Sequence, residues 1–131
     1  MLFIGLDIGT SATKCLLMNE AGAVLNIERA SYPTSFPEPG WSEQDPELWW
    51  NAVCDCIPRL LEGFDASQVV ALGSCGQMHG LVVLDEKGEV IRPAILWNDS
   101  RTRYQVDYLN REVGVKTVAS YTGNVAYTGF T

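Results

Sequence analysis

Hydrophobic residues in the first quarter of the chain form three runs separated by turn residues, a pattern that predicts three strands. The runs cover residues 2–8, 13–18 and 24–31. Gly9-Thr10-Ser11 separates the first two, and Asn19-Glu20-Ala21-Gly22 separates the second and third. Both are short stretches rich in turn formers. The chain is therefore expected to begin with two successive antiparallel hairpins.

A helix is predicted after a proline-rich loop. Asp45-Pro46-Glu47 combines a capping aspartate, a proline suited to the first helical position and an acid in the first turn. Apolar residues three or four apart predict that the helix continues to about Glu62. Pro58 is expected to kink this helix or end it early. Trp49 and Trp50 are expected in the core.

The remaining pattern mixes strands with a helix. The expected elements are a core strand at 68–74, a hairpin of 80–84 with 90–92, a short strand at 94–97, a helix capped by Asp99 or Ser100 that runs to about 112, and a turn-rich tail from 114. Mixed elements after an antiparallel start predict an α/β fold with a mixed sheet and flanking helices. An RNase H-like unit begins with this order.

Composition and charge exclude several classes of partner. The chain has 131 residues, with 9 basic and 16 acidic side chains and a net charge of −7. This balance argues against a nucleic-acid or anionic-membrane surface, since either would need a basic face. No apolar run approaches the length of a membrane span, and the first residues lack a basic start. We therefore expect a cytoplasmic protein with reduced thiols.

Four cysteines and one histidine do not make a metal site by their spacing. No C-x-x-C is present, and Cys54 and Cys56 would point to different sides of a helix. Buried structural thiols are the expectation.

The turn after the first strand is a candidate phosphate site. Asp7 ends a buried strand, and Gly9 allows a tight turn. Thr10 and Ser11 offer hydroxyl and N–H groups to an anion, and Lys14 adds a positive charge. Asp7 could hold Mg²⁺ directly or through water. The alternative is an ordinary β-turn, and no G-x-x-x-x-G-K-[ST] phosphate loop occurs.

A second polar turn follows the expected strand at 68–74. Gly76 and Gly80 bracket Gln77, Met78 and His79. Ligands of α/β sheets bind at the carboxyl ends of strands. His79 is the only histidine and could form a hydrogen bond with a sugar hydroxyl. The alternative is a loop histidine with no ligand.

A third candidate is Trp97-Asn98-Asp99-Ser100-Arg101, where an aromatic wall lies next to amide and carboxylate groups. Such mixtures bind sugars. The alternative is structural: Trp97 belongs to the core, Asp99 caps a helix and Arg101 pairs with an acid.

Together these segments resemble the FGGY carbohydrate kinases, most closely the members that phosphorylate xylulose. The resemblance covers nearly the whole chain in the family's order. Its residues are Gly5-Leu6-Asp7-Ile8-Gly9-Thr10-Ser11, Trp41-Ser42-Glu43-Gln44-Asp45-Pro46-Glu47 with Trp49-Trp50, Gly76-Gln77-Met78-His79-Gly80, Arg92-Pro93-Ala94-Ile95-Leu96-Trp97-Asn98-Asp99 and Gly129-Phe130-Thr131.

The resemblance implies a fold and a site. The fold would be two RNase H-like domains of the actin, hexokinase and heat-shock chaperone ATPase type, with residues 1–131 forming the N-terminal, incomplete part of the sugar-binding domain. The second, ATP-side domain would be absent from this chain. The implied contacts are Asp7 with Mg²⁺ through water, Gly9, Thr10, Ser11 and Lys14 with the ATP phosphates, and Gln77, Met78, His79, Trp97, Asn98 and Asp99 with the sugar.

The resemblance also implies an activity, the transfer of phosphate from ATP to a ketopentose, D-xylulose giving D-xylulose 5-phosphate. Glycerol kinases have an Arg-Glu pair in place of Met78-His79, which argues against glycerol. The family's catalytic aspartate lies in a glycine-rich Asp-Asn segment that does not occur here. The chain alone is therefore expected to be inactive, to expose apolar surface and to associate, as in a homodimer.

Three alternatives stay open at this point. The first is a carbohydrate-binding or interaction module without catalysis. The second is a kinase of the same family for another sugar or polyol. The third is a chaperone-type ATPase in which water replaces the sugar, and Gln77, Met78, His79 and Trp97 argue against it.

Overall fold

The computed structural model describes residues 1–130, and these form two compact units. The first unit consists of Met1–Thr34 and Asp45–Gln77. The second consists of Ser35–Gln44 and the chain from Met78 onward.

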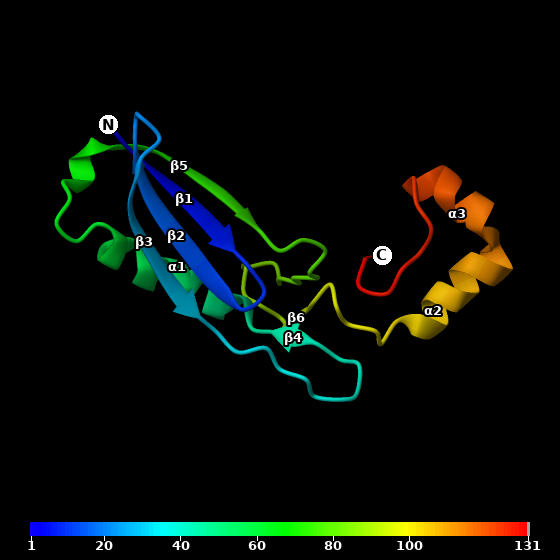
Figure 1. Ribbon diagram of the computed structural model, residues 1–131. Coiled ribbons are helices and arrows are strands. Elements are labelled where there is room, and N and C mark those ends of the chain that lie inside the picture. Colours follow the sequence, from blue (N-terminus) through cyan, green and yellow to red (C-terminus); the bar gives the residue numbers. More distant parts are fainter. Residues whose placement is uncertain (131) are drawn as a thin grey trace. The chain divides into compact units, whose positions relative to one another are not determined.

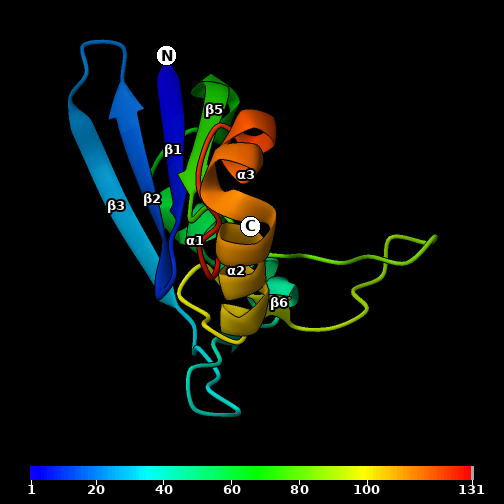
Figure 2. The ribbon, with the colours of Figure 1, turned by 90° about the vertical axis from the view of Figure 1, so that its right-hand side faces the viewer.

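The first unit is built on a four-stranded mixed sheet with the order β3-β2-β1-β5 (Figures 1 and 2). Its strands are β1 (Leu2–Ile8), β2 (Ala12–Asn19), β3 (Val24–Ser31) and β5 (Val69–Gly76). β2 pairs antiparallel with both β1 and β3, whereas β5 pairs parallel with β1. Both predicted hairpins are confirmed. The Asn19 side chain stabilises the second turn by accepting from the N–H groups of Ala21 and Ala23, each at 3.0 Å.

Helix α1 (Pro46–Leu60) begins where the sequence predicts. The Asp45 carboxylate accepts a hydrogen bond of 3.0 Å from the N–H of Glu47, and Pro46 occupies the first helical position. Pro58 lies in the last turn and the helix ends at Leu60, slightly earlier than the predicted Glu62. A short 3₁₀ turn, η1 (Ala66–Gln68), then leads into β5.

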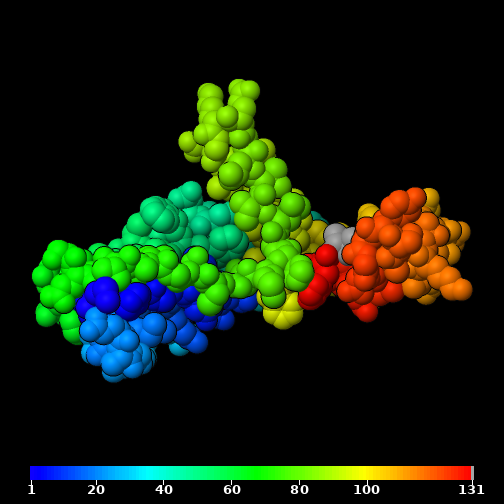
Figure 3. Space-filling model, turned by 90° about the horizontal axis from the view of Figure 1, so that it is seen from above, coloured from blue at the N-terminus to red at the C-terminus, as the bar shows by residue number. Residues whose placement is uncertain are grey.

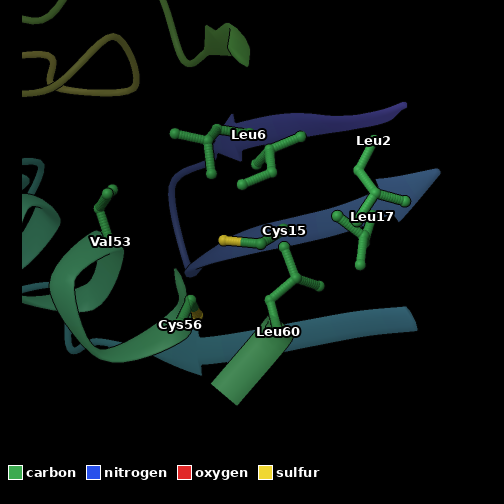
Figure 4. Packing of buried hydrophobic residues seen from close by; sticks show 8 residues of the cluster. Leu2, Leu6, Cys15, Leu17, Val53, Cys56 and Leu60 are labelled. Atoms are coloured by element: carbon green, nitrogen blue, oxygen red, sulfur yellow. The ribbon is translucent and has the colours of Figure 1, made fainter. Parts of the chain in front are cut away.

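The core of the first unit lies between one face of the sheet and α1. Figure 4 shows Leu6, Cys15 and Leu17 of the sheet near the helix residues Val53, Cys56 and Leu60. Leu17 and Leu60 are completely buried. α1 packs mainly on β2 and β3, so the hydrophobic contacts of this helix hold the second hairpin in place and, through β2, support the strand that follows the first turn.

Two burial expectations for the first unit are wrong. The strand predicted as core at 68–74 is formed by β5, but its side chains are largely exposed, Val70 to 54% and Leu72 to 50%. Among residues 1–130, β5 is the edge strand of this sheet and pairs with β1 alone. A β-branched run predicts a strand, but burial depends on what covers its faces. Trp50, expected in the core, is also exposed.

The second unit holds a small antiparallel pair and a helical segment. β4 (Glu43–Gln44) pairs with β6 (Ala94–Ile95). The predicted hairpin at 80–92 is reduced to isolated bridges, Leu84 with Val90 and Leu81 with Ile95. Residues 82–91 extend away from the rest of this unit (Figures 2 and 3).

The predicted second helix differs in both its limits. Helix α2 (Arg103–Tyr108) begins after Thr102, and the chain continues through a π-helical stretch, η2 (Leu109–Gly114), into α3 (Val115–Thr122). The expected turn-rich tail therefore contains a helix. Val115, Thr117 and Val118 are β-branched, a residue type with reduced helix propensity, which explains why the pattern did not predict α3. No helix within residues 1–130 has the length and apolar character needed to cross a bilayer.

The cysteines divide into two classes that thiol labelling should distinguish. Cys15 and Cys56 are buried, whereas Cys54 and Cys75 are exposed, contrary to the expectation that all are buried. Burial, with Cys56 close by, raises the pKa of the Cys15 thiol to about 12. At pH 8 we expect a thiol reagent to modify Cys54 and Cys75 rapidly and the other two only after unfolding. Rapid modification of Cys15 in the native protein would contradict this packing.

Candidate functional site

Asp7 lies at the carboxyl end of β1 and its side chain is exposed. In the sheet register, Asp7 lies opposite Lys14 of β2 and Cys75 of β5. An acidic and a basic side chain therefore occupy neighbouring positions where the first hairpin turns. The Gly9 N–H donates to the Ala12 carbonyl at 3.0 Å and closes this turn.

The turn is held by a second polar contact from within the same unit. The Tyr32 hydroxyl donates to the Gly9 carbonyl at 2.5 Å. This contact ties the turn to the end of β3, because Tyr32 directly follows that strand. The hydroxyl of Ser11 lies in the same turn, and the residue is exposed.

The first and second candidate turns meet in the structure. Thr10 Oγ1 donates to Gln77 Oε1 at 3.1 Å, although 67 residues separate them. The Gln77 N–H donates to the Ile8 carbonyl at 2.8 Å. Gly76 allows this approach, because a Cβ there would lie 2.6 Å from the Ile8 carbonyl oxygen. The parallel pairing of β1 with β5 thus places Asp7, Thr10 and Gln77 at one edge of the sheet.

Asp7 also lines a hollow of about 530 Å³. It is lined by Gly5, Leu6, Asp7, Lys14, Cys15, Leu16, Ile27, Gly73, Ser74 and Cys75. The hollow has two charged groups, the carboxylate of Asp7 and the ammonium group of Lys14. The other residues that line it are apolar or have small side chains. The hollow is open, which allows a ligand larger than its volume to enter partly.

The donor set at the turn fits a magnesium ion carried by phosphate. Mg²⁺ usually keeps several waters and takes one or two carboxylates together with phosphate oxygens. Asp7 supplies one exposed carboxylate. Within residues 1–130, no group of three or more His, Cys, Asp or Glu side chains gathers to hold a metal. The residues present therefore fit a hydrated, phosphate-bound ion better than an ion enclosed by protein ligands.

In the second unit, Met78 and His79 both present exposed side chains. His79 has a φ of 66°, a conformation that non-glycine residues adopt rarely. The His79 ring centroid lies 4.4 Å from that of Phe130, with 40° between the planes. An imidazole held against an aromatic ring while remaining open to solvent can donate or accept a hydrogen bond from a ligand.

Trp97 and Asn98 are exposed, whereas Asp99 is buried, with only 2% of the residue exposed. One Asp99 oxygen accepts from the Ser42 N–H at 2.7 Å, and Arg101 makes three side-chain contacts of 2.7–3.0 Å with the same carboxylate. Burial alone would raise the pKa of Asp99, but the hydrogen bonds from Arg101 and Ser42 outweigh it and hold the pKa below its usual value.

Arg101 connects this carboxylate to two further residues. Its guanidinium lies 2.8 Å from a Glu43 oxygen and 3.7 Å from the centroid of the Trp41 ring. Arg92 also pairs with Glu43, at 2.6 Å. The expected pairing of Arg101 with an acid is confirmed. The prediction that Asp99 caps a helix is wrong, because α2 begins at Arg103. Asp99 is thus committed to internal contacts that support the segment carrying Trp97 and Asn98.

Sequence reasoning missed several residues of this unit. Trp97 and Asn98 share a hollow of about 470 Å³ with Asn124, Tyr127, Thr128 and Phe130. These last residues belong to a segment expected as a turn-rich tail, in which only Gly129-Phe130-Thr131 matched the family. The aromatic residues Tyr127 and Phe130 were the local signal that could have indicated a binding surface. Glu43 was also missed, since nothing in its local sequence marks it as the partner of two arginines. Thr131, the last residue of the final matching segment, lies outside the described residues.

Comparisons with known proteins agree on one family. Residues 2–131 match the N-terminal domain of the FGGY family of carbohydrate kinases. The xylulose kinase of Escherichia coli (strain K12) is 43% identical over 130 residues, which are 99% of this chain and 26% of that protein. The chain thus spans about a quarter of the length of the curated relatives that it matches.

Solved structures agree with the sequence comparison. The crystal structure of a xylulose kinase from Brucella ovis matches with a TM-score of 0.91 at 38% identity, covering 100% of this chain and 27% of that one. A glycerol kinase from Plasmodium falciparum shares the fold with a TM-score of 0.88 at 20% identity, covering 99% of this chain and 27% of that one. The predicted RNase H-like fold of the actin and hexokinase type is confirmed. The chain belongs to the FGGY family of carbohydrate kinases.

Proposed function

We propose that this chain is the N-terminal part of the sugar-binding domain of an ATP-dependent ketopentose kinase, which converts D-xylulose to D-xylulose 5-phosphate. The observation that carries the proposal is the meeting of Asp7, Thr10 and Gln77 at the ends of β1 and β5. This places a carboxylate and a tight turn beside the residue that leads directly into Met78 and His79. The identity to xylulose kinases along the whole chain supports the choice of sugar.

The turn would bind the terminal phosphates of ATP. N–H and hydroxyl groups of Gly9, Thr10 and Ser11 would donate to phosphate oxygens, and Lys14 would supply a positive charge. Asp7 would hold the Mg²⁺ of ATP through water. That ion would neutralise charge on the transferred phosphate.

The sugar would bind at the exposed side chains of the second and third candidate segments, which carry Met78 and His79 and Trp97 and Asn98. The His79 imidazole would form a hydrogen bond with a ketose hydroxyl, and Met78 would contact the carbon chain. Trp97 would offer an apolar face, and the adjacent Asn98 would offer its amide. The Gln77 side chain, which directly precedes Met78 in the sequence, would also contact the sugar. Asp99 would act indirectly, because Arg101 and Ser42 already bind its carboxylate.

The reaction would consist mainly of positioning and charge neutralisation. A sugar hydroxyl oxygen would attack the γ-phosphorus, the bond to the β–γ bridging oxygen would break, and ADP would leave. The hydroxyl proton would pass to a general base. We assign that base, with the adenosine pocket, to an ATP-side domain that this chain does not include, consistent with the quarter of the relatives' length that the chain covers.

The complete protein would act in the cytoplasm and could pair as a homodimer.

A substrate panel tests the proposal. The complete protein, supplied with Mg²⁺ and ATP, is expected to phosphorylate D-xylulose with a kcat/KM at least about a hundredfold above that for glycerol, since a site that hydrogen-bonds substrate hydroxyls rejects poor matches strongly. Formation of ADP would be measured with and without each sugar. Equal use of glycerol would contradict the substrate, and sugar-independent ATP hydrolysis as the main activity would contradict the kinase.

A further inference from the structure

His79 is held in an unusual backbone conformation. It is the single non-glycine residue with positive φ among residues 1–130. Such a conformation persists only where surrounding contacts maintain it, and it often occurs at binding sites. The His79 side chain contacts the Phe130 ring, in a tilted stack with centroids 4.4 Å apart. We therefore infer that Phe130 holds the imidazole in place.

The Phe130 ring is fixed by its own neighbours. Its centroid lies 6.4 Å from that of Tyr127, with the planes at 70°, an edge-to-face arrangement. The Phe130 N–H donates to the Tyr127 carbonyl at 3.4 Å. The ring is thus supported on one side while its exposed part, 51% of the residue, remains available.

Gly129 explains how Phe130 reaches this position. Its φ is 75°, and a Cβ there would lie 1.8 Å from the carbonyl oxygen of Trp97. The backbone can therefore contact the Trp97 backbone only because residue 129 has no side chain. This contact anchors Phe130 beside the segment that carries Trp97 and Asn98.

Phe130 borders two hollows of the second unit. One, of about 330 Å³, is shared with His79, Gly80 and Asp99, and the other, of about 470 Å³, with Trp97 and Asn98. We propose that Phe130 is a positioning residue of the sugar site, which holds the His79 imidazole in place and forms the wall between the hollow shared with His79 and the hollow shared with Trp97. The role in sugar binding rests on the proposed function, whereas the stacking does not.

NMR spectroscopy of this chain tests the stacking without any activity. His79 is the only histidine, so its imidazole protons give unambiguous signals. Stacking on Phe130 is expected to displace these signals from their positions in a solvated histidine. Phe130→Leu should remove the displacement, Phe130→Tyr should retain it, and Tyr121→Leu, which removes an exposed ring on α3, should leave it unchanged. Identical His79 signals in the original chain and Phe130→Leu would overturn the stacking.

Kinetics of the complete protein test the consequence. Phe130→Leu is expected to raise KM for the ketose roughly tenfold with little change in kcat or in KM for ATP, and Phe130→Tyr should restore the original KM. Loss of the NMR displacement without a change in ketose KM would overturn the positioning role. If the unaltered protein phosphorylates no sugar, the proposed function fails, but the NMR result still decides the stacking. If Phe130→Leu does not fold, the comparison of Phe130→Tyr with Phe130→Trp decides it, since an unchanged His79 signal under the larger indole ring would contradict contact.

Discussion

Replacement of Asp7 by asparagine is expected to lower kcat of the complete kinase by on the order of 10²–10³-fold, with little change in KM for the ketose. Asparagine keeps the size of the side chain and its place at the end of β1 but removes the negative charge. In the proposed site that charge holds the hydrated Mg²⁺ of ATP, and catalysis of phosphoryl transfer consists of positioning and charge neutralisation, to both of which this ion contributes. Steady-state kinetics at several Mg²⁺ concentrations would measure the effect.

A matched control is Asp55→Asn in α1 of the same unit. Asp55 is also exposed, and its carboxylate pairs with Arg59 at 2.7 Å. Neither residue of this ion pair belongs to the proposed site. Exposed ion pairs contribute little to stability, so this variant should keep both kcat and KM. An Asp7→Asn enzyme with near-normal kcat and an unchanged need for Mg²⁺ would contradict the role of Asp7.

Truncation of Leu17 to alanine is expected to lower the free energy of unfolding by about 2–5 kcal/mol. Leu17 lies on the face of the sheet that packs against α1 and is completely buried beside Leu60 (Figure 4). The smaller side chain loses apolar contacts and leaves a cavity that the surrounding strands and helix can fill only in part. Urea denaturation followed by circular dichroism would measure the change in midpoint and slope.

Leu72→Ala provides the comparison, because it makes the same substitution on β5 where half of the leucine is exposed. Its effect is expected to stay within about 0.5 kcal/mol. Equal losses for the two variants would mean that the core does not lie between α1 and the β1–β2 face as described.

Local signals in the sequence predicted the elements that depend on local interactions. The hairpins follow from turn residues between apolar runs, and the start of α1 follows from Asp45 and Pro46. The limits of α2 and α3 were not predictable in this way, because a π-helical stretch joins them and β-branched residues begin α3. The exposure of β5 depends on which elements cover the sheet, and an apolar run does not report that.

The candidate site shows the same division. Each motif could be identified alone, but the hydrogen bond between Thr10 and Gln77 requires the parallel pairing of β1 with β5, a long-range feature. The sequence allows the pairing of Arg101 with an acid as one alternative, whereas no local pattern predicts that Phe130 packs against His79. Most of the features that the sequence could not predict are contacts between segments that lie far apart in the chain.

The proposed site is tested most directly by a crystal structure of the complete protein with Mg²⁺, a non-hydrolysable ATP analogue and D-xylulose. We expect the terminal phosphate within hydrogen-bonding distance of the turn formed by Gly9, Thr10 and Ser11, with Asp7 linked to Mg²⁺ through water and a sugar hydroxyl bound by His79. A terminal phosphate bound elsewhere, with the Asp7 turn making no contact to nucleotide or metal, would contradict it.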